Sequence, residues 1–290
     1  MKKYNRQFLT WACAALLSAA PQFHAAEPVA DPNELPRFPP TEPADALKTF
    51  KVKKGFHLEL VASEPLVTDP VSMSFDANGR LYVVEMRGYS EHREDSMGQI
   101  RLLEDTDYDG RMDKSTVFAR ELNWPTAVFC YDGGVFVGVT PDLWFMKDTN
   151  GDGVADLKKI VYTGFGSSRD RLNVQAMFNS LRWGLDNRIH GATAGNGGVV
   201  SNPSDKKAKP ISVRGRDFSF DPRTMELRAI DSTAQHGMSF DDWGRKFICS
   251  NSSHLQTVMY DSKYAGRNPH YTMPSPRISA AADGAAAEVY

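Results

Sequence analysis

From about Phe56 onward, short apolar runs alternate with turn signals, and no long run has the 3.6-residue period of a helix. The stretch VSMSFDANGRLYVVEM (71–86) has the pattern of a strand, a tight turn and a second strand. Three more stretches share this form: TAVFCYDGGVFVGV (126–139), NSLRWGLDNRIHGAT (179–193) and HGMSFDDWGRKFICSN (236–251). Turns rich in Asp, Asn and Gly suit hairpins, because these residues tolerate positive φ. The pattern therefore predicts four β-hairpins.

The hairpins recur at a nearly constant interval. Their turn positions, taken as Gly79, Gly134, Asn187 and Gly244, are 55, 53 and 57 residues apart. A strand-rich repeat of this length is typical of a β-propeller, in which each repeat forms one four-stranded sheet. We therefore predict an all-β propeller over residues 49–290, with about four blades in this chain. The alternative is a β-sandwich built from unrelated hairpins.

Four repeats fit into residues 56–275, and the chain then reaches GAAAEVY (284–290), which resembles the start of another strand. Propellers close by pairing their ends, because open sheet edges promote aggregation. Six blades of this size would need roughly 330 residues. The sequence thus favours the N-terminal part of a six-bladed propeller over a complete four-bladed one.

The residues before the repeats differ in composition from the rest. Residues 1–26 combine a basic start, an apolar stretch too short to span a bilayer, and small residues, which is the layout of a signal peptide. Residues 27–48 are acidic and rich in Pro, and we read them as an extended linker. The sequence predicts an exported protein, periplasmic or on the cell surface, without a transmembrane span.

Composition narrows the functional classes only slightly. The formal net charge is −2, so no basic surface argues for nucleic acid. Cys130 and Cys249 lie in apolar, strand-like runs. In an exported protein they could form a disulfide, and two buried free thiols fit equally well.

Two acidic segments have the same spacing of oxygen donors. DTDYDGRMD (105–113) and DTNGDGVAD (148–156) both carry Asp or Asn at positions 1, 3, 5 and 9 and Gly at position 6. Each is expected between the outer strands of successive blades. Ca²⁺ takes six to eight oxygen ligands from such groups, and Gly permits the sharp turn. We predict two structural Ca²⁺ loops; the alternative is a pair of Asp-rich turns stabilised by their own hydrogen bonds.

The proposed ligands follow the spacing. They are the side chains of Asp105, Asp107, Asp109 and Asp113 with the Arg111 carbonyl in the first loop, and those of Asp148, Asn150, Asp152 and Asp156 with the Val154 carbonyl in the second. Position 12 is Thr116 or Lys159, where an EF-hand has Glu, so these are EF-like loops in a strand context.

Candidates for chemistry stand where inner strands of a propeller begin. His236 stands there in the fourth repeat, and Asn179 and Arg182 stand at the equivalent point in the third. The segment 85–89 after the first hairpin is also dense in polar groups. A neutral His accepts a proton from a sugar or alcohol hydroxyl, and an Arg holds a carboxylate in fork geometry. A structural role for a single His is the competing interpretation.

Four motifs carry a family resemblance over residues 50–290: GFHLELVASEPLVTDPVSMSFDANGRLYVVEMRGY, DTDYDGRMDKSTVFA, NSLRWGLDN and HGMSFDDWGRKFICSNSSH. They resemble the propeller domain of a membrane-bound dehydrogenase family of planctomycetes and verrucomicrobia. That domain is similar in turn to soluble quinoprotein glucose/sorbosone dehydrogenases, six-bladed propellers that use pyrroloquinoline quinone and Ca²⁺. Longer members of the family often add a c-type haem domain as electron acceptor. In those enzymes the His that acts as the base stands shortly before a hairpin motif. His236 precedes FDDWGRKF and matches that His in position, although fewer residues separate it from the hairpin.

The resemblance implies an enzyme that oxidises a sugar or polyol through pyrroloquinoline quinone and passes electrons to a c-type cytochrome domain. In that reading His236 is the base, Arg182 and Asn179 lie near the site, and the cofactor-binding residues are not assigned. The alternative is a non-enzymatic, Ca²⁺-stabilised propeller that binds a glycan or a protein partner.

Overall fold

The computed structural model describes residues 39–168, 171–265, 267–268 and 270–282. The chain divides into two compact units, residues 1–46 and residues 47–290. The predicted signal peptide, most of the predicted linker and the predicted strand near the C-terminus lie outside the described residues. Among the described residues, no helix combines the length and the apolar character needed to cross a membrane.

Helical elements are few and short. They are α1 (Pro43–Ala46) in the first unit, and η1 (Leu47–Thr49), η2 (Arg93–Asp95), η3 (Val174–Ala176) and α2 (Ser262–Ala265) in the second. The other regular elements among the described residues of the second unit are antiparallel strands, and everything below concerns this unit.

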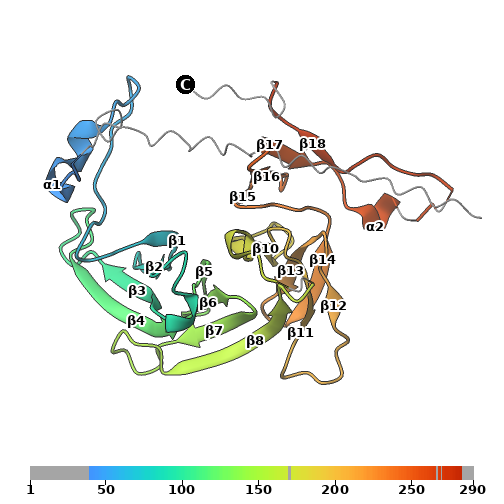
Figure 1. Cartoon of the computed structure of the whole chain (residues 1–290), viewed down its shortest axis with the longest axis horizontal. Coiled ribbons are helices and arrows are strands. Elements are labelled where there is room, and N and C mark those ends of the chain that lie inside the picture. The colour runs from blue at the N-terminus through green and yellow to red at the C-terminus, as the bar shows by residue number, and fades with distance from the viewer. Residues whose placement is uncertain (1–38, 169–170, 266, 269, 283–290) are drawn as a thin grey trace, which may run out of the picture. The chain divides into compact units, whose positions relative to one another are not determined.

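The strands form four sheets, numbered here in chain order (Figure 1). Sheet 1 contains β1 (Pro70–Phe75), β2 (Leu81–Glu85), β3 (Gly98–Glu104) and β4 (Lys114–Leu122). Sheet 2 contains β5 (Ala127–Tyr131), β6 (Gly134–Val139), β7 (Asp142–Lys147), β8 (Leu157–Phe165), β11 (Gly198–Ser201) and β12 (Ile211–Ser212). Sheet 3 contains β9 (Asn179–Trp183), β10 (Ile189–Ala192), β13 (Asp217–Asp221) and β14 (Glu226–Ile230). Sheet 4 contains β15 (Met238–Phe240), β16 (Lys246–Ser250), β17 (Ser253–Val258) and β18 (Arg277–Ser279).

The fold is an all-β propeller. Each predicted hairpin joins the first two strands of a sheet, so the four turns are in equivalent positions, as expected. The first strands of neighbouring sheets contact one another, β1 with β5, β5 with β9 and β9 with β15. These inner strands lie toward the middle of the fan of sheets in Figure 1, and the later strands lie outside them. A sandwich of unrelated hairpins is therefore wrong. Six blades for a longer protein stay a prediction.

Sheet 2 differs from the four-strand expectation. The segment between β10 and β13 returns to the edge of β8 and adds β11 and β12 to it. A Cβ on Gly198 would lie 2.3 Å from the Gly164 carbonyl oxygen, so the two backbones approach more closely than side chains allow. The addition covers an edge strand that would otherwise expose unpaired backbone groups.

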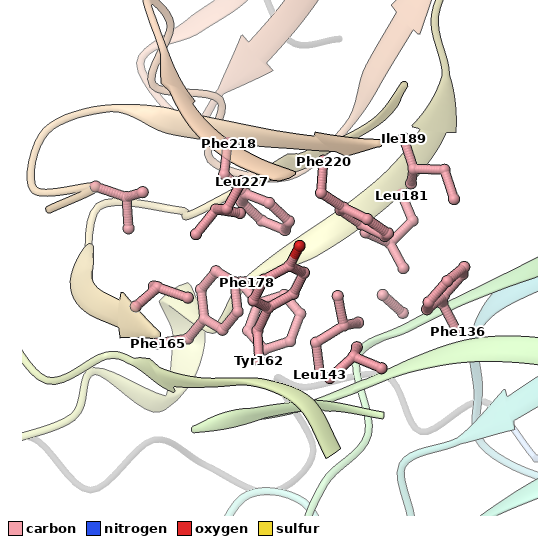
Figure 2. Packing of buried hydrophobic residues seen from close by; sticks show 14 residues of the cluster. Phe136, Leu143, Tyr162, Phe165, Phe178, Leu181, Ile189, Phe218, Phe220 and Leu227 are labelled. Carbon is pink, nitrogen blue, oxygen red and sulfur yellow. The ribbon is translucent and has the colours of Figure 1, made fainter. Parts of the chain in front are cut away.

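The layer between sheets 2 and 3 is the largest apolar cluster (Figure 2). Aromatic rings from both sheets meet edge to face: Phe136 of β6 lies 5.0 Å from Phe220 of β13, and Tyr162 of β8 lies 5.5 Å from the same ring. All three side chains are buried. Such pairs add to the free energy gained from burying their area.

Strand β6 faces two layers at once. Val135, Val137 and Val139 belong to the cluster between sheets 1 and 2, whereas Phe136 belongs to the cluster between sheets 2 and 3. Every residue of β6 is buried. A strand that is covered on both faces reads as a continuous apolar run, which explains GVFVGV.

Sheets 3 and 4 are joined by a smaller apolar cluster and a buried ion pair. Nζ of Lys246 on β16 lies 3.4 Å from Oδ2 of Asp217 on β13 and donates to Oγ of Ser232 at 2.6 Å. The amides of Thr193 and Ala234 also donate to Asp217. Burial lowers the pKa of Lys246, and Asp217 opposes that change. The pair is satisfied, as a buried charge must be.

Cys130 and Cys249 are free thiols, so the disulfide alternative for this pair is wrong. The Cys130 thiol on β5 lies 3.5 Å from the Ser74 carbonyl on β1, and the Cys130 amide donates to Ser74 Oγ at 3.2 Å. Burial raises the pKa of Cys130 to about 11. This cysteine helps to join two inner strands.

The aromatic layer should dominate stability. We expect Phe220→Ala to lower the free energy of unfolding by about 3–5 kcal/mol, because it leaves a cavity between sheets 2 and 3. The matched control is Phe75→Ala on β1, whose ring is 55% exposed and should cost roughly 0.5 kcal/mol. Urea unfolding of both variants measures the difference. Equal losses would show that the layer is not the main interface.

Candidate functional site

The first ends of the four inner strands surround a cavity of about 470 Å³, here called the inner-strand cavity. Asp69 and Pro70 stand at the start of β1, and Thr126 directly precedes β5. Asn179 begins β9, and His236 lies two residues before β15. The cavity is lined by Asp69, Pro70, Val71, Met86, Gly88, Tyr89, Thr126, Val174, Gln175, Met177, Asn179 and His236.

Two of the three predicted catalytic residues lie in this cavity. Asn179 and His236 line it, and Arg182 does not. Arg182 stands three residues further along β9, beyond a bulge in the pairing with β10, which places it roughly 10 Å away. Its Nη1 donates to the Leu181 carbonyl at 2.9 Å.

Asn179 is buried, and its amide is committed to the backbone. Its Nδ2 donates to the Gln235 carbonyl at 2.8 Å and to the Met177 carbonyl at 3.0 Å. Its Oδ1 accepts from the Ser180 hydroxyl at 2.6 Å. Asn179 therefore positions the segment before His236 and has no free donor for a ligand.

The backbone around His236 is held from both sides. The Gln235 amide donates to the Cys249 carbonyl at 3.0 Å, and the Gly237 amide donates to Ser180 Oγ at 3.0 Å. The Cys249 thiol lies 2.7 Å from the His236 carbonyl oxygen. Gly237 has φ 109°, and a Cβ there would lie 2.9 Å from Cys249 Sγ, so this position requires Gly. The His236 residue itself is exposed.

Three lining residues were not identified as candidates from the sequence alone: Asp69, Tyr89 and Gln175. Within the described part of the chain, their side chains and that of His236 make no hydrogen bond or ion pair. Tyr89 falls in the segment 85–89, whose density of polar groups was the one sequence feature that pointed to any of these three residues. Asp69 lies in the bend before β1 and Gln175 lies in η3, and only the tertiary fold brings them to the cavity.

Buried Glu85 fixes the loop that carries Asp69. Its carboxylate accepts from the Thr68 amide at 2.8 Å and from Gln99 Nε2 at 2.5 Å, and it lies 3.4 Å from Arg101 Nε. Glu85 is thus part of the support of the cavity, one residue before Met86 of its lining.

The acidic loops lie where the sequence predicts. Residues 105–113 connect β3 to β4, and residues 148–156 connect β7 to β8. In the first loop, carboxylate oxygens of Asp105, Asp107 and Asp109 all lie within 4.8 Å of one another. These three carboxylates, which carry like charges at close range, fit a hard cation such as Ca²⁺.

Position 9 of each loop has another partner. Asp113 accepts from the Thr106 hydroxyl at 2.6 Å, and Asp156 accepts from the Thr149 hydroxyl at 2.7 Å. These hydrogen bonds hold the pKa of both carboxyls below the usual value. Asp113 is not in the group of three carboxylates, so this structure shows three gathered oxygens where the spacing predicts four.

Hydrogen bonds inside the loops match the alternative interpretation as well. Asp105 accepts from the Tyr108 and Gly110 amides at 2.7 and 2.9 Å, and Asp148 accepts from the Gly151 and Gly153 amides at 2.7 and 2.8 Å. Loops of this form are stable as Asx turns. The geometry is compatible with Ca²⁺ and does not require it.

Each acidic loop also contacts a segment that precedes its sheet in the chain. The eighth residue donates its amide outward at 2.8 Å: Met112 to the Val61 carbonyl, and Ala155 to the Phe118 carbonyl of β4. Both residues are buried. The second loop therefore connects neighbouring sheets, and the first holds the segment that leads to β1.

A protein-family model described as Domain of unknown function (DUF7133) matches residues 42–290. The chain belongs to the DUF7133 family. The match covers all four sheets and the inner-strand cavity. A search of curated proteins returned no match to this DUF7133 chain.

Several solved structures share a limited likeness with this DUF7133 chain. The holo form of the pyranose dehydrogenase PQQ domain from Coprinopsis cinerea has 14% identity and a TM-score of 0.47, over 72% of this chain and 47% of that one. A Lactobacillus plantarum protein has 15% identity and a TM-score of 0.43, over 70% and 54%. A calcium structure of a Trichoderma reesei carbohydrate-active enzyme of family AA12 has 12% identity and a TM-score of 0.39, over 69% and 47%. The chain spans about half the length of these proteins.

Asn179 provides a direct test of how the cavity is supported. We expect Asn179→Ala to lower the free energy of unfolding by about 1–3 kcal/mol, because the Gln235 and Met177 carbonyls lose a buried donor. Gln175→Ala, at an exposed residue of the same cavity, should change it by roughly 0.5 kcal/mol or less. Chemical denaturation compares the two. Similar values for both would contradict the positioning role.

Chelation tests the acidic loops. If Ca²⁺ binds only the native state, a hundredfold excess over Kd adds about 2.7 kcal/mol of stability per site. We expect EDTA to lower the melting temperature and excess Ca²⁺, but not Mg²⁺, to restore it. Asp107→Ala combined with Asn150→Ala should remove most of this response, whereas Asp242→Ala in the β15–β16 turn should keep it. A melting curve that is indifferent to chelator would exclude a structural metal in these loops.

Proposed function

We propose that this protein is an exported propeller that binds a sugar or related polyol in the inner-strand cavity. The observation that carries the proposal is that one lining gathers four polar side chains, those of Asp69, Tyr89, Gln175 and His236, which have no hydrogen-bond or ion-pair partner among the described residues. They come from segments that adjoin three different sheets: Asp69 and Tyr89 flank the first hairpin of sheet 1, Gln175 precedes sheet 3 and His236 precedes sheet 4. The cavity volume, about 470 Å³, is in the range of small-molecule sites.

The chemistry of the lining matches a polyhydroxylated ligand. A carboxylate accepts hydrogen bonds from hydroxyls, an amide both donates and accepts, and a phenol does the same. Apolar Val71, Met86 and Met177 form much of the remaining wall, against which the C–H face of a sugar ring can pack. A few polar groups on an apolar wall are typical of specific ligand sites.

His236 gives the cavity a group that can take part in proton transfer. An unprotonated imidazole accepts a proton from a bound hydroxyl when the two lie within hydrogen-bond distance. The bonds to Gln235, His236 and Gly237 fix the backbone that carries this ring. This preorganisation favours a second candidate function, oxidation of the bound hydroxyl as in the quinoprotein glucose/sorbosone dehydrogenases that the sequence resembles.

The quinone of that second candidate does not fit the lining. Pyrroloquinoline quinone is a tricarboxylate, and such ligands are commonly held by Arg or Lys. Among the described lining residues there is no Arg or Lys, and Asp69 contributes a negative charge. We therefore derive no step through the quinone. A c-type cytochrome domain as electron acceptor belongs to this second candidate alone.

Two further parts of the proposal concern stability and location. Ca²⁺ in the acidic loops would neutralise Asp105, Asp107 and Asp109 and stiffen the contacts that Met112 and Ala155 make. Export is supported by the predicted signal peptide, residues 1–26. For an exported propeller of this kind, the simplest activity is to bind a glycan without turning it over.

Calorimetric titration with neutral sugars and polyols tests the proposal. We expect at least one to bind, and His236→Asn to change the affinity by less than about tenfold, since one hydrogen bond to an exposed group is lost. If the protein also reduces an added electron acceptor, the same variant should lower that rate by about 10²–10⁴. Binding without turnover would remove the second candidate, and no binding to any neutral sugar would overturn the proposed function.

A further inference from the structure

We infer that Asp69 makes the inner-strand cavity selective for uncharged ligands, so that sugar acids and tricarboxylates are excluded. This inference rests on the proposed function, because it concerns the ligand of the same cavity. It adds the ligand's charge class and the residue that sets it.

Asp69 is the one carboxylate among the described lining residues, and no Lys or Arg lines the cavity beside it. Within the described chain, it has no ion-pair or hydrogen-bond partner for its side chain. An unpaired carboxylate attracts hydroxyl donors and repels other carboxylates. If an anionic ligand places its charge a few ångströms from this carboxylate near the protein surface, the repulsion should weaken its binding by about tenfold or more relative to a neutral ligand.

The backbone that carries this charge is held in place. Asp69 has φ 46°, and its carbonyl accepts from the Met86 amide at 3.1 Å. On one side the Thr68 amide donates to buried Glu85, and on the other Pro70 begins β1. The main chain at Asp69 therefore does not need to be ordered when a ligand binds, which preserves affinity.

The left-handed backbone offers a competing explanation for an aspartate here. Asp and Asn are the residues other than Gly that best tolerate positive φ. The residue could therefore serve the turn alone. Asp69→Asn separates the two roles, because it keeps the conformation and the size of the side chain and removes the charge.

A nearby cation is the competing determinant. Arg171 lines an outer depression that shares Tyr89, Val174 and Gln175 with the cavity. An anionic ligand could extend outward and reach it. Arg171→Gln tests this route, and it lies outside the described lining of the inner-strand cavity.

The experiment compares matched neutral and anionic probes by calorimetry: D-glucose, D-glucuronate and pyrroloquinoline quinone. We expect the wild-type chain to bind glucose at least about tenfold more tightly than glucuronate, with no binding of the quinone. Asp69→Asn should reduce the ratio of the two sugar affinities to about threefold or less. The matched control is Asp132→Asn, which changes an exposed aspartate with φ 49° in the β5–β6 turn and should keep the wild-type ratio.

The outcomes separate the two proposals. Preference for glucuronate or the quinone in the wild type, or a ratio unchanged by Asp69→Asn, overturns the inference and leaves the cavity as a ligand site. If Arg171→Gln abolishes binding of the anionic probes, the cation sets the charge class and the inference is wrong. Binding of neither sugar, nor of other neutral polyols at millimolar concentration, overturns the proposed function and the inference with it.

Discussion

The structure depends on one requirement: a sheet that has a neighbour on each side is apolar on both faces, and both faces must be covered. Strand β6 shows this most clearly, because its alternate residues enter two different clusters. A single sheet cannot meet the requirement, and neither can a pair, since each added sheet brings a further apolar face. Sheets arranged around a common centre satisfy it with short connections. The aromatic layer of Phe136, Tyr162 and Phe220 is where the burial is most extensive.

The candidate site follows from the same arrangement. Because the first strand of every sheet lies innermost and runs in the same sense, their first ends meet in one place. Segments 69–71, 86–89 and 174–177 and residue 236 are thereby brought together, although they belong to the surroundings of three different sheets. The sheets themselves carry little chemistry. Their buried polar residues, such as Glu85, Asn179 and Asp217, are used to hold loops and neighbouring sheets in place.

What the sequence predicts well here is local. The four hairpins and both acidic loops follow from turn residues and the alternation of apolar positions, and they lie where expected. The added strands β11 and β12 were missed, because an edge that needs covering is a property of the assembled sheet. Arg182 was grouped with Asn179 on sequence proximity, yet it lies further along β9 and does not line the cavity. Asp69 and Gln175 carry no local signal, and their importance appears only with the fold. Asn179 was expected near the site. It lines the cavity, but its side chain holds the backbone before His236 in place and has no donor left for a ligand.

The central claim is that loops from separate sheets form one ligand site. Hydrogen–deuterium exchange of the chain with and without a saturating neutral sugar tests it most directly. We expect reduced exchange together in the peptides that contain 68–70, 86–89, 174–177 and 235–237, with no change in the acidic loops at 105–113 and 148–156. Protection confined to a single one of these segments, or protection of the acidic loops instead, would contradict a common site at the first ends of the inner strands.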